Sequence, residues 1–200
     1  MCNCCWPNPA IAANNGCRVM NRNNLINMAW MQGLWFAAVL SAASSQYWPA
    51  PIILVLFGLW HTRPAIHVSG DFRLVPAALV LGMILDSAWI RLGWLQYASP
   101  WPDTDYAPLW ILLLWFGLAL TLNHSLAWLQ SRLWLAGLLG GITCPFSYWA
   151  AARLGALTIT ENSGAWIFGL ALSWAATLPL LLWMAREIRQ KDHPLEAKHV

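Results

Sequence analysis

The sequence predicts an all-α fold, a polytopic transmembrane bundle of about six helices with both termini in the cytoplasm. Three observations lead to this prediction. Of the 200 residues, 59% are hydrophobic and only 10% are charged, whereas about a quarter of the residues in a soluble domain are charged. The apolar residues gather in segments that approach the length of a membrane span. The basic residues lie almost entirely at one set of segment ends.

Composition also limits the partners of the chain. A soluble protein of this length could not enclose so much apolar surface in its core, so the surplus must face a lipid bilayer. The 16 tryptophans agree, because tryptophan gathers at membrane–water interfaces. The net charge of +3 is small and forms no basic patch, which argues against nucleic acid as a partner. A membrane-protein partner and a homo-oligomer both stay open.

Residues 1–24 are predicted to form a disordered cytoplasmic tail, because they are polar and lack any periodicity. They contain no apolar stretch of the kind that a signal peptide requires. The tail contains Cys2, Cys4, Cys5 and Cys17. The spacing of these cysteines matches no zinc site well. Met20 closely precedes the first apolar segment and is a possible true start of the protein.

The membrane domain is predicted over residues 25–185, followed by a basic cytoplasmic tail over residues 186–200. The expected spans are, in order, residues 25–43, 48–63, 74–95, 108–129, 133–152 and 164–185. The second stands apart, because its strongly apolar part, residues 52–60, is shorter than the roughly 20 residues of a usual span. It is either a full crossing or a re-entrant segment.

Charge favours the full crossing. With six crossings, nine basic residues fall on one side of the membrane: Arg18, Arg22, Arg63, Arg73, Arg132, Arg186, Arg189, Lys191 and Lys198. Only Arg91 and Arg153 fall on the other side. Lysine and arginine are retained in the cytoplasm, so this arrangement places both termini there. A second segment that did not cross would split the downstream basic residues between the two sides.

Two patterns concern the packing of the spans. Gly137 and Gly141 have the four-residue spacing that lets two membrane helices approach closely. The sequence Arg-Leu-Gly-x-Leu occurs twice, in residues 91–95 at the end of the third span and in residues 153–157 at the end of the fifth. A duplicated two-helix hairpin would explain this echo, and so would chance in a small apolar alphabet.

The candidate polar membrane site centres on Asp86, near the middle of the third span. A carboxylate at that depth is unfavourable unless it is paired, so it normally faces protein or a water-filled cavity. It is either a proton-coupled, cation-coupled or catalytic group, or a structural carboxylate held by hydrogen bonds. The other members of the candidate site are Ser87, Asn123, His124, Ser147 and Tyr148.

The histidines allow two further interpretations. His124 lies towards the cytoplasmic end of the fourth span, and a connection from Asp86 to His124 would suit a proton relay. His61 lies near the same side of the membrane, so a pair of haem ligands is an alternative. The sequence contains no hydrolase, P-loop or zinc-protease motif. We therefore expect no cofactor and no metal.

Several short stretches together carry a family resemblance: Asn27, residues 32–37, 81–87, 108–110, 122–126 and 140–148. From about Met20 to Lys191, the chain resembles a family of small bacterial inner-membrane proteins, catalogued as domain of unknown function 2878. The resemblance implies a multi-pass protein of the bacterial inner (cytoplasmic) membrane and implies no particular reaction. Members of that kind are encoded near lipid-modifying enzymes, which hints at lipid metabolism.

The first functional hypothesis is a small transporter or carrier component that uses an intramembrane carboxylate. The alternative is a membrane-embedded enzyme or an accessory subunit in lipid metabolism. Whether the chain is an enzyme stays open from the sequence.

Overall fold

The structure, a computed structural model, describes residues 22–68, 70–160 and 164–192. The helices are α1 (Arg22–Ala43), α2 (Pro49–His61), α3 (Leu74–Arg91), α4 (Leu109–Ala119), the 3-10 helix η2 (Ala127–Ser131), α5 (Leu133–Arg153) and α6 (Ala165–Asp192). The predicted helical fold class is confirmed. The tail cysteines and residues 193–200 of the second tail lie outside the described residues.

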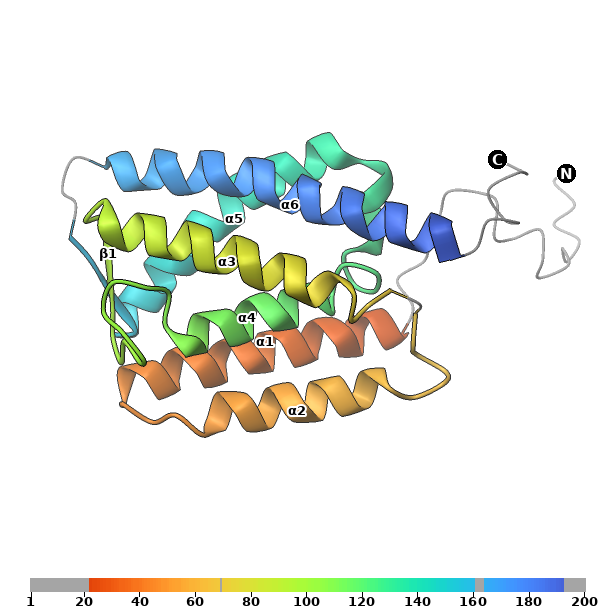
Figure 1. The fold of residues 1–200 in the computed structure, drawn as a ribbon, viewed down its shortest axis with the longest axis horizontal. Helices are drawn as coiled ribbons and strands as arrows, with labels where there is room; N and C mark the ends of the chain where they lie inside the picture. The colour runs from red at the N-terminus through yellow and green to blue at the C-terminus, as the bar shows by residue number, and fades with distance from the viewer. Residues whose placement is uncertain (1–21, 69, 161–163, 193–200) are drawn as a thin grey trace, which may run out of the picture.

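The six α-helices extend between the same two ends of the molecule, and each runs opposite to the one before it (Figure 1). At one end lie the start of α1, the end of α2, the starts of α3 and α5, and the end of α6. We call it the basic end, because it carries Arg22, Arg63, Arg73, Arg132 and Arg189. The opposite end carries Arg91 and Arg153, the last residues of α3 and α5.

Four helices, α1, α3, α5 and α6, are long and apolar enough to cross a membrane. The other two, α2 and α4, have only 13 and 11 residues. At 1.5 Å per residue they are about 20 Å and 17 Å long, against about 30 Å for the hydrocarbon core of a bilayer. Beyond Ala119 the chain continues through turns into η2. The fourth predicted span is therefore an α-helix over only part of its length.

The interruption after α4 has a local cause. The hydroxyl of Thr121 donates to the carbonyl of Leu118 at 2.6 Å, a side-chain bond that competes with continued helix formation. The backbone amides of His124 and Leu126 both bond to the carbonyl of Thr121. This frees the carbonyl of Leu120 for side chains from other helices.

The outer surface of the bundle is apolar. Phe168 is 79% exposed, Leu172 is 76% exposed and Trp134 is 73% exposed, all of them on long helices. Large exposed apolar patches mark surfaces that contact a membrane or another protein. This surface matches the surplus of apolar residues in the composition.

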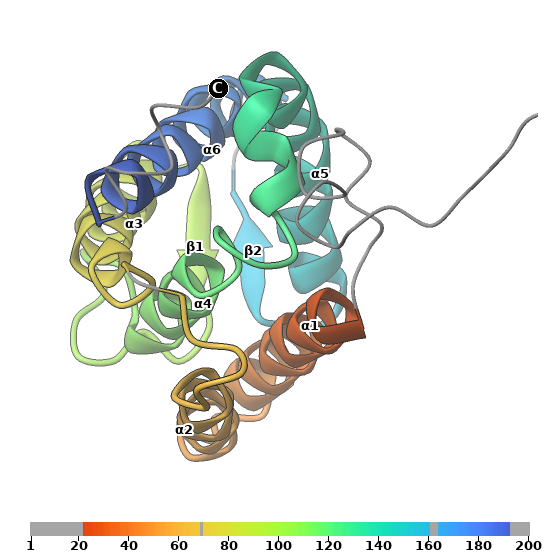
Figure 2. The ribbon, with the colours of Figure 1, turned by 90° about the vertical axis from the view of Figure 1, so that its right-hand side faces the viewer.

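The predicted close approach through Gly137 and Gly141 is confirmed, and the partner helix is α6. A Cβ atom on Gly137 would lie 3.0 Å from the backbone oxygen of Ala175. One on Gly141 would lie 3.1 Å from the backbone oxygen of Ala171. Figure 2 shows α5 and α6 side by side. Only glycine allows the two backbones to come this close.

The repeated Arg-Leu-Gly-x-Leu segments fold in the same way. Gly93 and Gly155 follow the ends of α3 and α5 with φ angles of 68° and 83°, which favour glycine. Beyond them lie β1 (Leu95–Tyr97) and β2 (Leu157–Ile159), which pair antiparallel with Leu95 opposite Ile159. The sequence analysis missed both strands and continued the third span to residue 95.

The ends of the membrane domain also differ from the prediction. Helix α1 begins at Arg22, so residues 22–24 are helical and are not part of a tail. Helix α6 continues to Asp192, seven residues beyond the predicted end of the last span at residue 185. A charged helix end therefore replaces the first part of the predicted basic tail.

Candidate functional site

Asp86, in the second half of α3, is completely buried, and its carboxylate accepts three hydrogen bonds. The hydroxyls of Tyr97 and Tyr148 both donate to Oδ1, the second at 2.8 Å. The indole nitrogen of Trp115 donates to Oδ2 at 2.8 Å. Such bonds offset the free energy of removing a carboxylate from water. We call Asp86 and these three donors the carboxylate cluster.

Three different elements bring the donors to Asp86. After the turn at Gly93, β1 crosses the end of the bundle and buries Tyr97 (Figure 1). Trp115 comes from α4, where its ring occupies the space beside Gly82, one turn before Asp86. Tyr148 comes from α5. The sequence does not single out two of the donors, because Tyr97 lies between the third and fourth predicted spans and Trp115 is one of 16 tryptophans in the chain.

The two serines predicted with Asp86 have other partners. Ser87 Oγ accepts the backbone amide of Ala107 at 2.9 Å, which fixes the loop before α4 to α3. Ser147 Oγ accepts the indole N–H of Trp35 at 2.9 Å. This bond crosses from α1 to α5. Of the predicted site residues, Tyr148 is the one that contacts Asp86 directly.

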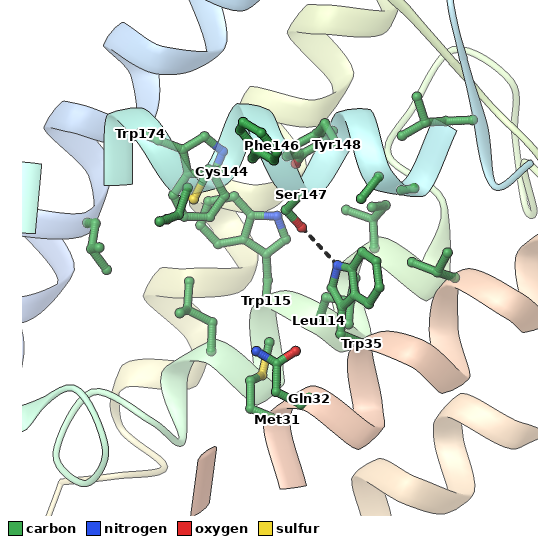
Figure 3. Close-up of a pocket in the computed structure, with 18 of the residues that line it drawn as sticks. Met31, Gln32, Trp35, Leu114, Trp115, Cys144, Phe146, Ser147, Tyr148 and Trp174 are labelled. Atoms are coloured by element: carbon green, nitrogen blue, oxygen red, sulfur yellow. Dashed lines mark hydrogen bonds between the residues drawn. The ribbon is translucent and has the colours of Figure 1, made fainter. Parts of the chain in front are cut away.

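A pocket of about 550 Å³ lies beside the carboxylate cluster, between side chains of α1, α4, α5 and α6 (Figure 3). Its lining is mostly apolar and aromatic, with the polar side chains Gln32, Thr143, Ser147 and Tyr148 among it. Trp115 and Tyr148 line the pocket and also bond to Asp86. A change in the protonation of Asp86 therefore acts on the pocket wall through Trp115 and Tyr148.

Trp174 lines the same pocket. Its indole stacks on that of Trp115, with ring centroids 4.7 Å apart. Among the residues that the structure describes, its Nε1 is the only buried side-chain nitrogen or oxygen without a hydrogen-bond partner. A buried donor without an acceptor is unfavourable by about 1–3 kcal/mol.

A second polar cluster lies at the basic end and contains the predicted residues Asn123 and His124. His124 Nε2 lies 2.8 Å from Oδ2 of Asp71, and the amide of Asn123 donates to Oδ1 of Asp71 at 3.0 Å. Burial raises the pKa of Asp71, but the bonds and charge of His124, together with Asn123, outweigh it and hold the pKa below its ordinary value.

His61, the last residue of α2, completes this group. Its ring meets that of His124 edge to face, with centroids 4.7 Å apart. Each of His61, Asp71 and His124 offers a potential ligand atom, and these atoms lie within 4.8 Å of one another. We call these three residues the histidine cluster. The sequence placed both histidines near one side of the membrane, but it missed Asp71, which it assigned to a polar loop.

The histidine cluster suits a bare ion and does not suit haem. A haem bound between the two imidazoles would hold their rings apart on opposite faces of the macrocycle. Here the two rings are in direct edge-to-face contact, at a centroid distance of 4.7 Å. No macrocycle fits between them in this arrangement.

The carboxylate cluster and the histidine cluster are separate. Helix α3 begins at Leu74, three residues after Asp71, and Asp86 lies twelve residues further along it. At 1.5 Å per residue this corresponds to about 18 Å along the helix. No hydrogen bond joins Asp86 to Asn123 or His124 among the described residues.

Comparison with known proteins identifies a family. The family described as Protein of unknown function (DUF2878) matches residues 24–180. The chain belongs to this family. The DUF2878 match includes every residue of the carboxylate and histidine clusters, as the resemblance over residues 20–191 predicted. No curated protein and no solved structure matches the chain.

Proposed function

We propose that the protein is a small transporter or carrier component of the bacterial inner membrane, which binds an apolar or amphipathic molecule in the pocket beside Asp86. The observation that carries this proposal is the pocket of about 550 Å³, whose mostly apolar wall includes Trp115 and Tyr148, two of the donors to Asp86. It fits a molecule with a largely apolar body. Ligand sites in proteins commonly combine an apolar lining with a few polar groups.

The proposal includes six crossings with both termini in the cytoplasm. Its support is that α2 and α4 lie between the same two ends of the bundle as the four longer helices (Figure 1). The segregation of arginine at the basic end also supports it. The short α4 is extended by residues 120–131, in which the backbone oxygens of Leu120 and Leu122 accept hydrogen bonds from buried side chains.

Asp86 is the proposed coupling group. As a carboxylate it accepts from Tyr97, Trp115 and Tyr148. Once protonated it becomes a donor itself and needs one fewer donor from its surroundings. The hydroxyl of Tyr148 can then turn to a bound molecule in the pocket. Proton uptake and ligand binding would be linked in this way.

A flux assay tests the proposal. Proteoliposomes with trapped pyranine and an NBD-labelled phosphatidylethanolamine report proton movement and lipid movement in one sample. We expect faster movement of both than in empty liposomes. Asp86→Asn should abolish the coupling of the two, and Ala150→Phe, which fills the pocket, should abolish lipid movement.

Two matched variants serve as controls for this assay. Asp105→Asn changes an exposed carboxylate, and Ala29→Phe enlarges an exposed side chain on α1 outside the pocket. Both should behave as the unmodified protein does. Unchanged coupling in a folded Asp86→Asn protein contradicts the role of Asp86. Unchanged lipid movement in Ala150→Phe contradicts the role of the pocket.

The alternative function is a membrane-embedded enzyme or an accessory subunit in lipid metabolism. The mostly apolar lining of the pocket favours it, because an acyl chain would fit there. Lipid profiling of a deletion strain separates the two functions. A new or missing lipid species favours the enzyme, and an unaltered lipid profile contradicts it. One stoichiometric membrane-protein partner on purification favours the accessory subunit.

A further inference from the structure

His61 has a backbone oxygen beside each of its ring nitrogens. Its Nδ1 lies 3.1 Å from the backbone oxygen of Phe57, and its Nε2 lies 2.9 Å from the backbone oxygen of Leu120. A neutral ring has one N–H to donate, so one ring nitrogen keeps a lone pair.

The amide of Asn27 indicates that this nitrogen is Nε2. Its oxygen accepts from the backbone and hydroxyl of Ser125, at 3.3 Å and 2.6 Å, so its NH₂ group must face the other way. That group donates to the backbone oxygen of Leu120 at 3.1 Å and lies 3.2 Å from Nε2 of His61. A proton on Nε2 would place two donors against each other, and a lone pair on Nε2 avoids this.

The remaining ring nitrogen of His61 is then in the arrangement usual for a metal ligand. Nδ1–H donates to the carbonyl of Phe57, one turn earlier on α2, and Nε2 keeps a lone pair, which an ion would take over from the NH₂ group of Asn27. Histidines that bind metals generally donate their other N–H to a carbonyl or a carboxylate, which fixes the ring. Asp71 and His124 lie next to this nitrogen and are equally buried.

We propose that the histidine cluster binds a divalent transition-metal ion of the Zn²⁺ type through His61, Asp71 and His124. Two imidazoles and one carboxylate form a ligand set that zinc and non-haem iron both use. The ligand atoms lie within 4.8 Å of one another, against about 3.4 Å around a tetrahedral zinc ion. A small rearrangement closes the site, in which an ion replaces the direct contact of 2.8 Å between His124 Nε2 and Asp71 Oδ2. The carbonyl oxygen of Leu120 lies beside the fourth position.

A chain of outer hydrogen bonds holds the carboxylate in place. Asn123 donates to Oδ1 of Asp71, which leaves Oδ2 for the ion. Gln130 on η2 donates to the oxygen of Asn123 at 3.0 Å, and Arg189 on α6 donates to Gln130 at 2.8 Å. Such supporting bonds raise metal affinity by orienting the ligands. The ion would fasten the end of α2, the loop before α3 and the unwound end of α4 to one another.

Zinc titration of the full chain tests the proposal. Cys2, Cys4, Cys5 and Cys17 are replaced by serine so that the tail thiols bind no metal. The protein is purified in detergent, stripped with a chelator and titrated with ZnCl₂, and bound zinc is measured by mass spectrometry after desalting. We expect about one equivalent per chain and a rise in Tm. His61→Gln and Asp71→Asn should bind about tenfold or more weakly.

The control variant is His67→Gln, which changes an exposed histidine in the same loop as Asp71 and should bind zinc normally. Absence of zinc from the folded serine-substituted protein overturns the proposal. Equal binding by His61→Gln and the control overturns it as well. If a ligand variant does not fold, X-ray absorption of the zinc-bound protein decides. Two imidazoles at the metal support the site, and none overturns it.

Discussion

At the scale of single residues, Asp86 illustrates how a buried carboxylate depends on its neighbours. Both of its oxygens are used, and the three donors come from β1, α4 and α5. Removal of the carboxylate strands three buried donors at once. Removal of its charge alone leaves an oxygen that can still accept. The two kinds of substitution therefore have different consequences.

We expect Asp86→Ala to lower the free energy of unfolding by about 3 kcal/mol or more, because each stranded donor is unfavourable by roughly 1–3 kcal/mol. Asp86→Asn should be milder, since its amide oxygen replaces one acceptor. Thermal unfolding in detergent measures both. Asp105→Ala, at an exposed carboxylate, is the control. A Tm for Asp86→Ala equal to that of the control would show that the carboxylate cluster does not hold the fold together.

At the scale of elements, the contact between α5 and α6 depends on three glycines that face one helix. Gly140 is the tightest, because a Cβ atom there would lie 2.7 Å from the backbone oxygen of Trp174. The backbone of α6 at Trp174 cannot shift away from an added methyl group as easily as a flexible side chain could. The same contact sets the position of the Trp174 indole in the pocket.

We predict that Gly140→Ala destabilises the protein by about 1–3 kcal/mol, because the two helices must separate to accept the methyl group. Gly33→Ala is the matched control, since Gly33 lies in α1 with nothing within 4 Å of its Cβ position. That substitution should be neutral or stabilising by up to about 1 kcal/mol, from helix propensity alone. Tm values of the two variants in the same detergent distinguish these outcomes. Equal effects would contradict the close approach of α5 and α6.

The elements differ in how far the sequence predicts them. Helices such as α1, α3, α5 and α6 follow from long apolar runs, and the Gly137–Gly141 spacing correctly marks a helix contact. The strands escaped prediction because three-residue segments carry almost no periodicity. The end of α4 was also missed, since Leu120 and Leu122 continue an apolar run while Thr121 breaks the helix through its side chain.

The site was predicted in part for a similar reason. An ionisable residue within an apolar run stands out in the sequence, which is how Asp86 and His124 were found. Their partners do not stand out. Tyr97 and Asp71 lie in segments between the helices, where polar residues are ordinary, and only the fold brings them to Asp86 and His124.

At the scale of the whole molecule, the distribution of charge between the two ends predicts how the bundle lies in a membrane. Cysteine labelling tests six crossings directly, in a protein whose native cysteines are replaced by serine. We expect Asp105→Cys to react with a membrane-impermeant maleimide in intact cells. Thr62→Cys and Ser131→Cys, at exposed positions of the basic end, should react only after permeabilisation.

Thr62 decides whether α2 crosses. If α2 were re-entrant, the residue after it would stay on the side from which α2 starts, so Thr62→Cys would react in intact cells, and Asp105→Cys, one crossing later, would not. Labelling of Thr62→Cys only after permeabilisation excludes this. Reaction of Ser131→Cys in intact cells would contradict the proposed path of α4.

The three donors to Asp86 follow it in the chain by 11, 29 and 62 residues. If the chain enters a bilayer from its N-terminus, as the proposed topology implies, Asp86 is inserted before most of its partners have been synthesised. Tyr97 arrives almost at once, Trp115 with the next helix, and Tyr148 only with α5. The hydrogen bonds that stabilise the buried carboxylate therefore form in the order of synthesis. They are complete only when α5 has been inserted.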